Sequence, residues 1–233
     1  MPPEPVIYVV IPARNEATYL PGVLGRLDEV CTEGFPLRVC VVDDASTDDT
    51  AALAEAAGAH VVRMSHNVGK GAAARAGADA AVAARAEIIV LVDADGQHRP
   101  EDIPRFVEAI AAGDAQVVHG VRSFGHEMPL LFRVGNLALN LCLFVLFGLW
   151  TRDSQCGMQA FSATAYRSLR WASTDYSMES EILVRVARAG LPRVDVEIPT
   201  IYLDSAKGTR PSDGVRILGQ MLRWRFRLPP APA

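Results

Sequence analysis

The sequence predicts an α/β domain with a mainly parallel central sheet flanked by helices. The first observation is a series of short apolar runs, rich in Val, Ile and Leu: VIYVVI from Val6, LRVCVV from Leu37, AHVVRM from Ala59 and EIIVLV from Glu87. Strands that are covered on both faces have this near-continuous apolar character. The second observation is that polar turns and Ala-rich segments separate the runs, which is the pattern of βαβ units.

The segments between the apolar runs have the composition of helices. Ser46 and Thr47 are good N-cap residues for the segment that ends at Gly58. The stretch from residue 71 to 86 is rich in alanine and has a high helix propensity despite Gly77. We therefore expect both segments to be helices that cover the sheet.

Composition limits the class of protein. The 233 residues, 50% hydrophobic and 21% charged, are typical of one globular domain with a sizeable core. A net charge of −4 gives no global electrostatic reason to expect a nucleic acid partner. The cysteines and histidines form neither a C-x-x-C nor an H-E-x-x-H motif, which argues against zinc and against a disulfide framework. The N-terminus lacks the basic segment of a secretory signal, so we expect a cytoplasmic protein.

Polar turns follow the predicted strands at their carboxyl ends. They are PARNEA from Pro12, DDASTDDT from Asp43, SHNVGKG from Ser65 and DADGQH from Asp93. In an open parallel sheet these strand ends meet at one edge, and ligands bind there. The carboxylates gathered at this edge repel one another unless they are exposed to solvent or neutralised by a cation, and the second alternative predicts a cation-dependent site.

The D-x-D of Asp93 and Asp95 is the strongest candidate for that site. In an extended D-x-D both carboxylates point to the same side, which suits Mg²⁺ or Mn²⁺ holding a diphosphate, and Gln97 adds a neutral oxygen. Glu101 and Asp102 lie at an apparent helix start, where they are partners of the helix dipole rather than metal ligands. Taken alone, a D-x-D is more often a solvated acidic turn than a metal site, and it is the neighbouring polar turns that favour the metal site.

A competing motif is GKGAAA from Gly69, which satisfies the dinucleotide fingerprint G-x-G-x-x-[GA]. That fingerprint normally lies in the first βα turn, whereas the first turn here, from Pro12, has no glycine. The segment is not a Walker A loop, because Gly71 follows Lys70 where Ser or Thr is needed. An NAD-binding oxidoreductase therefore remains only a remote alternative.

Taken in order, several segments resemble a known family. IPARNEA, VVDDASTDDT, NVGKGAAARAG and LVDADGQHRPEDI resemble successive blocks of the inverting family 2 glycosyltransferases with the GT-A fold. DSQCGMQAF from Asp153 and the segment from Ser177 to Leu203 are similar to the branch that contains dolichol-phosphate mannose synthase and bacterial polyprenyl-phosphate sugar transferases. The resemblance implies a Rossmann-like nucleotide-diphospho-sugar transferase domain over residues 1–204. Residues 205–233 then form a basic acceptor-side loop and a C-terminal amphipathic helix.

The resemblance also implies roles for individual residues. The nucleotide-sugar residues are Pro12, Asn15, Glu16, Asp43, Lys70 and Asp93, with Asp43 facing the base. The metal ligands for Mg²⁺ or Mn²⁺ are Asp93, Asp95 and Gln97, and the catalytic residues are Asp95, Arg122 and Arg210. The acceptor-side residues and candidate bases are Arg133, Asp153, Glu179 and Lys207. For Arg122 and Arg133 the alternative is a solvated surface arginine, and for Asp153 and Glu179 it is a structural role.

The activity that this resemblance implies is transfer of a hexose, mannose or glucose, from a GDP- or UDP-sugar to a polyprenyl or dolichyl phosphate. Bond cleavage at the sugar C1 builds negative charge on the leaving diphosphate, which a divalent cation and basic side chains stabilise. An ionised phosphate acceptor needs no general base, whereas a hydroxyl acceptor does. The alternatives are transfer to a soluble small-molecule or glycan hydroxyl and a non-catalytic module that binds a nucleotide sugar.

Two segments predict contact with a membrane surface. Residues 134–150 are the most apolar stretch, but they are shorter than the roughly 20 residues of a spanning helix and contain Asn136, Asn140 and Gly148. We expect a buried or interfacial helix there.

Residues 205–227 carry six Lys or Arg against one Asp, as a basic amphipathic helix on anionic headgroups does. We therefore expect peripheral attachment at the cytoplasmic face of the membrane, with a helix packed on the domain as the alternative.

Overall fold

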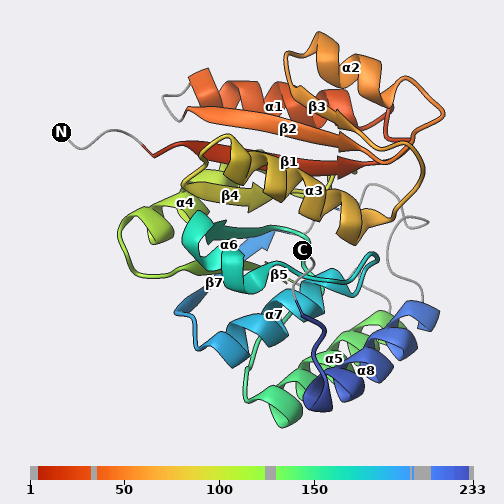
Figure 1. The fold of residues 1–233 in the computed structure, drawn as a ribbon, viewed down its shortest axis with the longest axis vertical. Coiled ribbons are helices and arrows are strands. Elements are labelled where there is room, and N and C mark those ends of the chain that lie inside the picture. The colour runs from red at the N-terminus through yellow and green to blue at the C-terminus, as the bar shows by residue number, and fades with distance from the viewer. Residues whose placement is uncertain (1–4, 33–35, 124–129, 200, 202–210, 231–233) are drawn as a thin grey trace.

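The structure, a computed structural model, describes residues 5–32, 36–123, 130–199, 201 and 211–230. Its centre is a seven-stranded sheet of order β3-β2-β1-β4-β6-β5-β7 (Figure 1). The strands are β1 (Ile7–Ala13), β2 (Leu37–Asp43), β3 (His60–Arg63), β4 (Ile88–Leu91), β5 (Val117–Ser123), β6 (Gln159–Ser162) and β7 (Arg193–Pro199). Within this sheet β6 runs antiparallel to both of its neighbours, and the other pairs are parallel. The predicted mainly parallel α/β fold is therefore confirmed.

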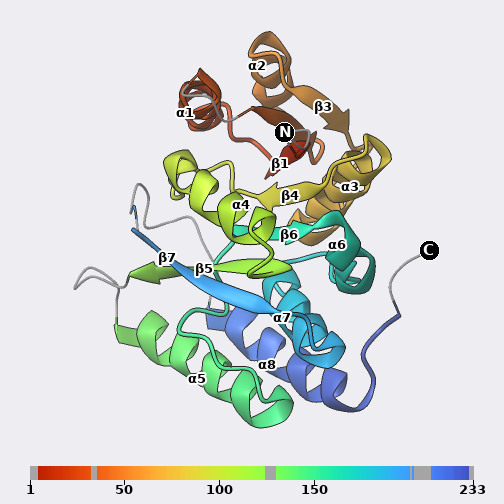
Figure 2. The same cartoon turned by 90° about the vertical axis from the view of Figure 1, so that its left-hand side faces the viewer.

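Helices cover both faces of the sheet (Figure 2). They are α1 (Leu20–Thr32), α2 (Thr50–Ala56), α3 (Lys70–Ala83), α4 (Ile103–Ala111), α5 (Leu130–Phe147), α6 (Ala163–Leu169), α7 (Met178–Ala189) and α8 (Pro211–Phe226), with a 3-10 turn at Pro100–Asp102 before α4. Apolar residues of α1, α2 and α4 share one core cluster with one face of the strands. Residues of α3, α6 and α7 share a second cluster with the other face.

The alternation of side chains along β1 shows why both layers form. Val9 and Ile11 are fully buried in the first cluster, and Val10 is fully buried in the second. Successive side chains of a strand point to opposite faces, so a run of apolar residues supplies both cores. Gly77 lets α3 approach the sheet closely, because an added Cβ would lie 2.7 Å from a methyl carbon of Val42. This close approach explains a glycine in the middle of an otherwise alanine-rich helix.

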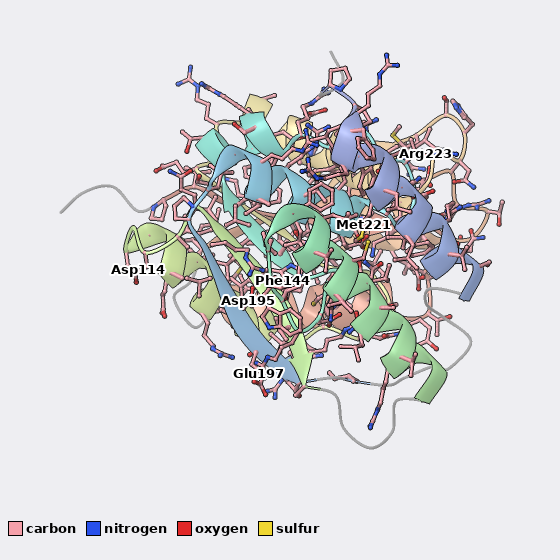
Figure 3. All side chains as sticks on the ribbon, turned by 90° about the horizontal axis from the view of Figure 1, so that it is seen from below. Asp114, Phe144, Asp195, Glu197, Met221 and Arg223 are labelled. Carbon is pink, nitrogen blue, oxygen red and sulfur yellow. The ribbon has the colours of Figure 1, made fainter. Side chains whose placement is uncertain are left out.

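Helices α5 and α8 form a third layer against α7 (Figures 1 and 3). They lie side by side, and Met221 lies between them in Figure 3. Leu139 and Leu143 of α5 pack in one cluster with Ile217 and Met221 of α8. The expected apolar helix of residues 134–150 is thus α5, which ends just before Gly148, a glycine with a φ of +72°. Among the described residues, no helix is long and apolar enough to span a bilayer.

The loops after β1 and β2 are joined by their own side chains. Ser46 accepts a hydrogen bond from the Asn15 amide at 3.0 Å, and the Thr47 amide donates to Asn15 Oδ1 at 2.8 Å. The expectation that Ser46 and Thr47 cap the following helix is wrong, because α2 begins only at Thr50 and its N-cap residue is Asp49. Their polar groups are used instead to hold the two loops together at the carboxyl edge of the sheet.

Candidate active site

A cleft of about 690 Å³ lies at the carboxyl edge of the parallel strands. The loops after β1, β2 and β4, the start of α3, residues 175–179 and the first turns of α8 form its wall. The residues expected from the sequence that line it are Pro12, Glu16, Lys70, Asp93, Asp95, Gln97, Arg122 and Glu179. Segments far apart in the sequence therefore converge where the turn pattern predicted a site.

Lys70 bridges two carboxylates in this cleft. Its Nζ lies 2.7 Å from Asp93 Oδ1 and 2.9 Å from Glu179 Oε1, and the Lys70 side chain is only 18% exposed. Burial acts to lower the pKa of Lys70, but the two carboxylates outweigh it and raise that pKa. Burial likewise acts to raise the pKa of Asp93, yet Lys70 holds it below its usual range. Lys70 is therefore a fixed positive charge in the wall of the cleft.

Glu179 differs from Asp93 although both contact the same lysine. Its side chain is 3% exposed, and its Oε2 has no hydrogen-bond partner within the described part of the chain. Burial raises the pKa of Glu179, and Lys70 only partly opposes this effect. A carboxyl with a raised pKa in a cleft is better suited to proton transfer than an ordinary glutamate.

The donor set at the D-x-D suits a hard divalent cation. Asp95 Oδ1 accepts the Gln97 amide at 3.0 Å, which fixes the turn, and burial followed by the charge of Asp93 raises the pKa of Asp95. The negative charge of Asp93 acts against ionisation of Asp95, and a cation placed between the two carboxylates relieves this repulsion. No group of three or more His, Cys, Asp or Glu among the described residues is placed to hold a metal ion. A cation here would need oxygens from water or phosphate beside Asp93, Asp95 and Gln97, as Mg²⁺ commonly does.

Gly157 provides the space for the Asp93 carboxylate. A Cβ at position 157 would lie 2.8 Å from both Cγ and Oδ1 of Asp93 and still nearer to its other oxygen. Such distances are too short for real carbon atoms, so any side chain there would displace the carboxylate. The glycine of the segment DSQCGMQAF therefore has a specific function in shaping the acidic site.

Arg122 enters the cleft from the end of β5 and is held by Asp153. Its Nε lies 2.6 Å from Asp153 Oδ2 and its Nη2 lies 3.0 Å from Oδ1, a two-point ion pair. Asp153 is fully buried and lies behind the arginine, outside the cleft lining. Burial acts to raise the pKa of Asp153, but Arg122 outweighs it and lowers that pKa. This position is unlike that of a general base facing an acceptor, and it makes Asp153 the residue that orients Arg122.

The GKG segment has a structural explanation that excludes the dinucleotide fingerprint. The amides of Val68 and Gly69 donate to the Asp44 carboxylate at 2.7 and 2.9 Å. The Gly71 amide donates to the Thr174 carbonyl at 3.0 Å, and an added Cβ there would meet the backbone of residues 173–175. The amides that a fingerprint offers to a pyrophosphate are thus bound within the protein.

The sequence-based expectation gave Asp43 as the residue facing the base and Asp44 as the less certain partner, and it did not include several other residues of the cleft. Asp44 lines the cleft whereas Asp43, buried, accepts the Ser46 amide and does not line it. Arg216 of α8 reaches Asp213 at 2.8 Å and Asp175 at 3.4 Å. The remaining additions are Ala13, Arg14, Asn67, Gly69, Ala73, Ala94, Gln155 and Tyr176. In the chain α8 comes after β7, which is not among the four apolar runs predicted as strands, so the strand-and-turn pattern contains no signal for it.

Four other residues expected from the sequence are not among those that line the cleft in the described part of the chain. Asn15 and Arg133 are outside the cleft lining, and Asn15 has a φ of +55° in the loop it shares with Ser46. Lys207 and Arg210 lie outside the described residues. The roles expected for these residues stay predictions.

The α/β fold, with a carboxylate pair, a lysine and an arginine at the carboxyl edge of its sheet, matches transferases of the GT-A type. Residues 8–166 match the family described as glycosyl transferase family 2. The chain belongs to this family, and the expected fold and enzyme class are confirmed.

Relatives with known names extend this result. The chain is 31% identical to the UDP-N-acetylglucosamine–dolichyl-phosphate N-acetylglucosaminyltransferase of Methanococcus voltae over 94% of this chain and 96% of that one. It is also 31% identical to the undecaprenyl-phosphate mannosyltransferase of Micrococcus luteus, over 89% of this chain and 88% of that one. The fold is also similar to a solved structure of glucosyl-3-phosphoglycerate synthase from Mycobacterium tuberculosis, which is in complex with Mn²⁺, UDP and glucosyl-3-phosphoglycerate. The match covers 97% of this chain and 82% of the synthase chain, with 25% sequence identity and a TM-score of 0.71.

Proposed function

We propose that this protein is a divalent-metal-dependent inverting glycosyltransferase that moves a hexose from a UDP- or GDP-sugar to a polyprenyl phosphate at a membrane surface. The observation that carries the proposal is the dual position of α8. Its first turns place Asp213 and Arg216 in the cleft, while the same helix exposes Val215, Leu222 and Phe226 to solvent. A single helix thus borders both the charged site and an apolar outer surface.

The donor side of the cleft fits a nucleotide diphosphate. Asp93, Asp95 and Gln97 would hold the divalent cation, which supplies positive charge to the leaving diphosphate. Lys70 and Arg122 add fixed positive charge to the same cleft. As the acceptor oxygen attacks the sugar C1, the C1–oxygen bond to the diphosphate breaks and its electron pair stays on the diphosphate. A phosphate acceptor is already ionised near neutral pH, so this step needs no proton transfer.

The outer surface of α5 and α8 fits the headgroup region of a bilayer. Large apolar side chains on α5 are exposed, including Leu137 at 58% and Val145 at 70%, and Phe226 of α8 is 89% exposed. Trp150, half exposed, contacts Phe144 edge-on with ring centroids 6.0 Å apart. The exposed arginines at the end of α8 are Arg223, Arg225 and Arg227. Apolar side chains beside arginines are the composition of helices that lie on anionic membranes.

The named relatives support the lipid acceptor. Two of them are named for transfer to dolichyl phosphate and to undecaprenyl phosphate, and they align with about nine tenths of this chain or more. In this proposal residues 1–204 are the catalytic domain and residues 205–233 face the acceptor and the lipid. The cytoplasmic location expected from the sequence stays part of the proposal.

A second candidate is transfer to a hydroxyl acceptor. The buried carboxyl of Glu179, with its raised pKa and an oxygen that has no partner among the described residues, has the properties of a general base in this cleft. A solved relative in the fold comparison is a synthase of glucosyl-3-phosphoglycerate. Glu179→Gln distinguishes the two functions, because it should stop hydroxyl transfer while leaving transfer to an ionised phosphate within about tenfold of wild type.

The test combines donors, acceptors and one variant. Purified protein with Mn²⁺ is given UDP-glucose, UDP-N-acetylglucosamine or GDP-mannose together with a short polyprenyl phosphate or 3-phosphoglycerate. Transfer to the polyprenyl phosphate, lost on addition of EDTA and in Asp95→Asn, is the expected result. Transfer to 3-phosphoglycerate but not to the polyprenyl phosphate would refute the lipid acceptor and support the hydroxyl acceptor. Turnover that is unchanged by EDTA would refute the metal dependence.

The membrane part of the proposal has its own measurement. We expect co-sedimentation with vesicles that contain anionic phosphatidylglycerol, weakened by salt and by the triple change of Arg223, Arg225 and Arg227 to Gln. The control is Arg63→Gln on the distant strand β3, which should leave sedimentation unchanged. Equal sedimentation of the wild type and the triple variant would refute the role of these arginines.

A further inference from the structure

Helix α5 carries two asparagines on its buried side, in the middle of its apolar sequence. Asn140 is 3% exposed and Asn136 is 8% exposed, whereas Leu137 and Leu141 beside them are more than half exposed. A buried amide is unfavourable unless it is hydrogen-bonded, and leucine would pack equally well on a helix that only fills space. The asparagines therefore have partners that a leucine could not bind.

Those partners are the backbone groups on either side of Asp153. Asn140 Nδ2 donates to the Arg152 carbonyl at 2.8 Å, and Asn140 Oδ1 accepts the Ser154 amide at 2.9 Å. Asn136 Nδ2 adds a longer bond, 3.3 Å, to the same Arg152 carbonyl. One amide side chain thus holds the residue before and the residue after Asp153, which leaves that loop little freedom to shift.

The loop matters because Asp153 determines where Arg122 lies. Both carboxylate oxygens of Asp153 bind the Arg122 guanidinium, and Asp153 Oδ2 also accepts the Arg122 amide at 3.2 Å. From β5, His119 Nε2 lies 2.6 Å from the Asp153 carbonyl. The position of Arg122 in the cleft therefore depends on a loop that is clamped between α5 and β5.

We propose that Asn140 is a positioning residue for Arg122, and that it joins the helix with the exposed apolar face to the arginine of the cleft. Asn136 assists it through the shared carbonyl. The contribution of Arg122 to binding a diphosphate rests on the function proposed above. The mechanical link between Asn140 and Arg122 rests only on the hydrogen bonds and is tested without turnover.

The first experiment observes the Arg122 Nε–H group by ¹H–¹⁵N NMR, with its signal assigned as the one missing from Arg122→Lys. In Asn140→Ala we expect this signal to move or broaden, because the two-point ion pair with Asp153 loses its fixed geometry. The matched control is Leu143→Val, one turn along α5, which loosens a fully buried contact without any bond to the loop. An Nε–H signal that is unchanged in Asn140→Ala, or changed equally in the control, would overturn the proposal. If Asn140→Ala does not fold, the Arg122 Nε–H signal is measured in Asn136→Ala instead. An unchanged signal in that variant counts against the proposal.

The second experiment is a double-variant cycle on the binding of UDP and GDP in the presence of Mn²⁺. Asn140→Ala should raise the dissociation constant on the order of tenfold, because a small misplacement of a charged group is costly. In the Arg122→Lys background the same change should have no further effect, since the two residues act through one contact. Additive effects would show a general loosening of the fold and would overturn the proposal. If the protein transfers no sugar to a polyprenyl phosphate, the function proposed above fails while the NMR result still decides this one.

Discussion

Replacement of Lys70 by methionine tests the charge arrangement of the cleft. Methionine keeps most of the volume but leaves Asp93 and the nearly buried Glu179 facing each other without their shared cation. Removal of one partner from a buried ion pair costs about 3–5 kcal/mol. Asp93 is 22% exposed and partly screened by water, so we expect the lower end, a loss of about 3 kcal/mol in the free energy of unfolding. For a chain of this size that loss lowers the Tm by roughly 6–12 °C.

The assay is urea and thermal unfolding followed by circular dichroism in metal-free buffer at neutral pH. The surface pair of Arg63 and Glu55, with a similar N–O distance of 2.9 Å but side chains more than half exposed, is the control. Arg63→Met should cost less than about 1 kcal/mol. In Lys70→Met, Mn²⁺ should raise the Tm more than it does in the wild type, because the cation replaces the missing charge. The second change Glu179→Gln should restore much of the lost stability.

Two results would refute this reasoning. A Lys70→Met protein as stable as Arg63→Met would show that the two carboxylates do not depend on the lysine. A destabilised variant that Glu179→Gln fails to rescue would show that lost packing, and not unpaired charge, is the cause.

Three further predictions concern single residues. Gly157→Ala should displace the Asp93 carboxylate and lower Mn²⁺-dependent turnover at least tenfold, and turnover within twofold of wild type would contradict the close contact. Asp153→Asn should flatten the acid end of the plot of unfolding free energy against pH. Because Arg122 lowers the pKa of Asp153 in the folded state, the ion pair stabilises the fold above pH 3.8, and this stabilisation is lost as the pH falls below that value. Equal acid slopes for the variant and the wild type would disprove the pairing. Gly77→Ala improves helix propensity by about 1 kcal/mol, but the added methyl group overlaps valines of the sheet, which costs about 1–3 kcal/mol. Urea unfolding should therefore show no increase in the free energy of unfolding. A clear stabilisation would mean that α3 can move away from the sheet.

The fold and the place of the site were predictable because their signals are local. Each apolar run and each turn lies within a few residues, and parallel strands must bring their carboxyl ends to one edge. Asp93, Asp95 and Lys70 therefore meet in a cleft that the turn pattern alone locates. The apolar stretch of α5 was likewise evident from composition, as was the basic character of the C-terminal segment.

The sequence by itself determined the α/β class, the edge of the sheet that carries the acidic turn and the family to which the chain belongs. Only the tertiary structure decided which carboxylates are paired and which face the cleft. Asp153 lies behind Arg122, although 31 positions separate them in the chain, and Arg216 reaches the cleft from a helix near the C-terminus. Asn140, which in the sequence only interrupts an apolar helix, holds the loop on which Arg122 depends. The physical reason is that hydrogen bonds and ion pairs depend on distances of about 3 Å between side chains, and no spacing along the chain records these distances once helices intervene.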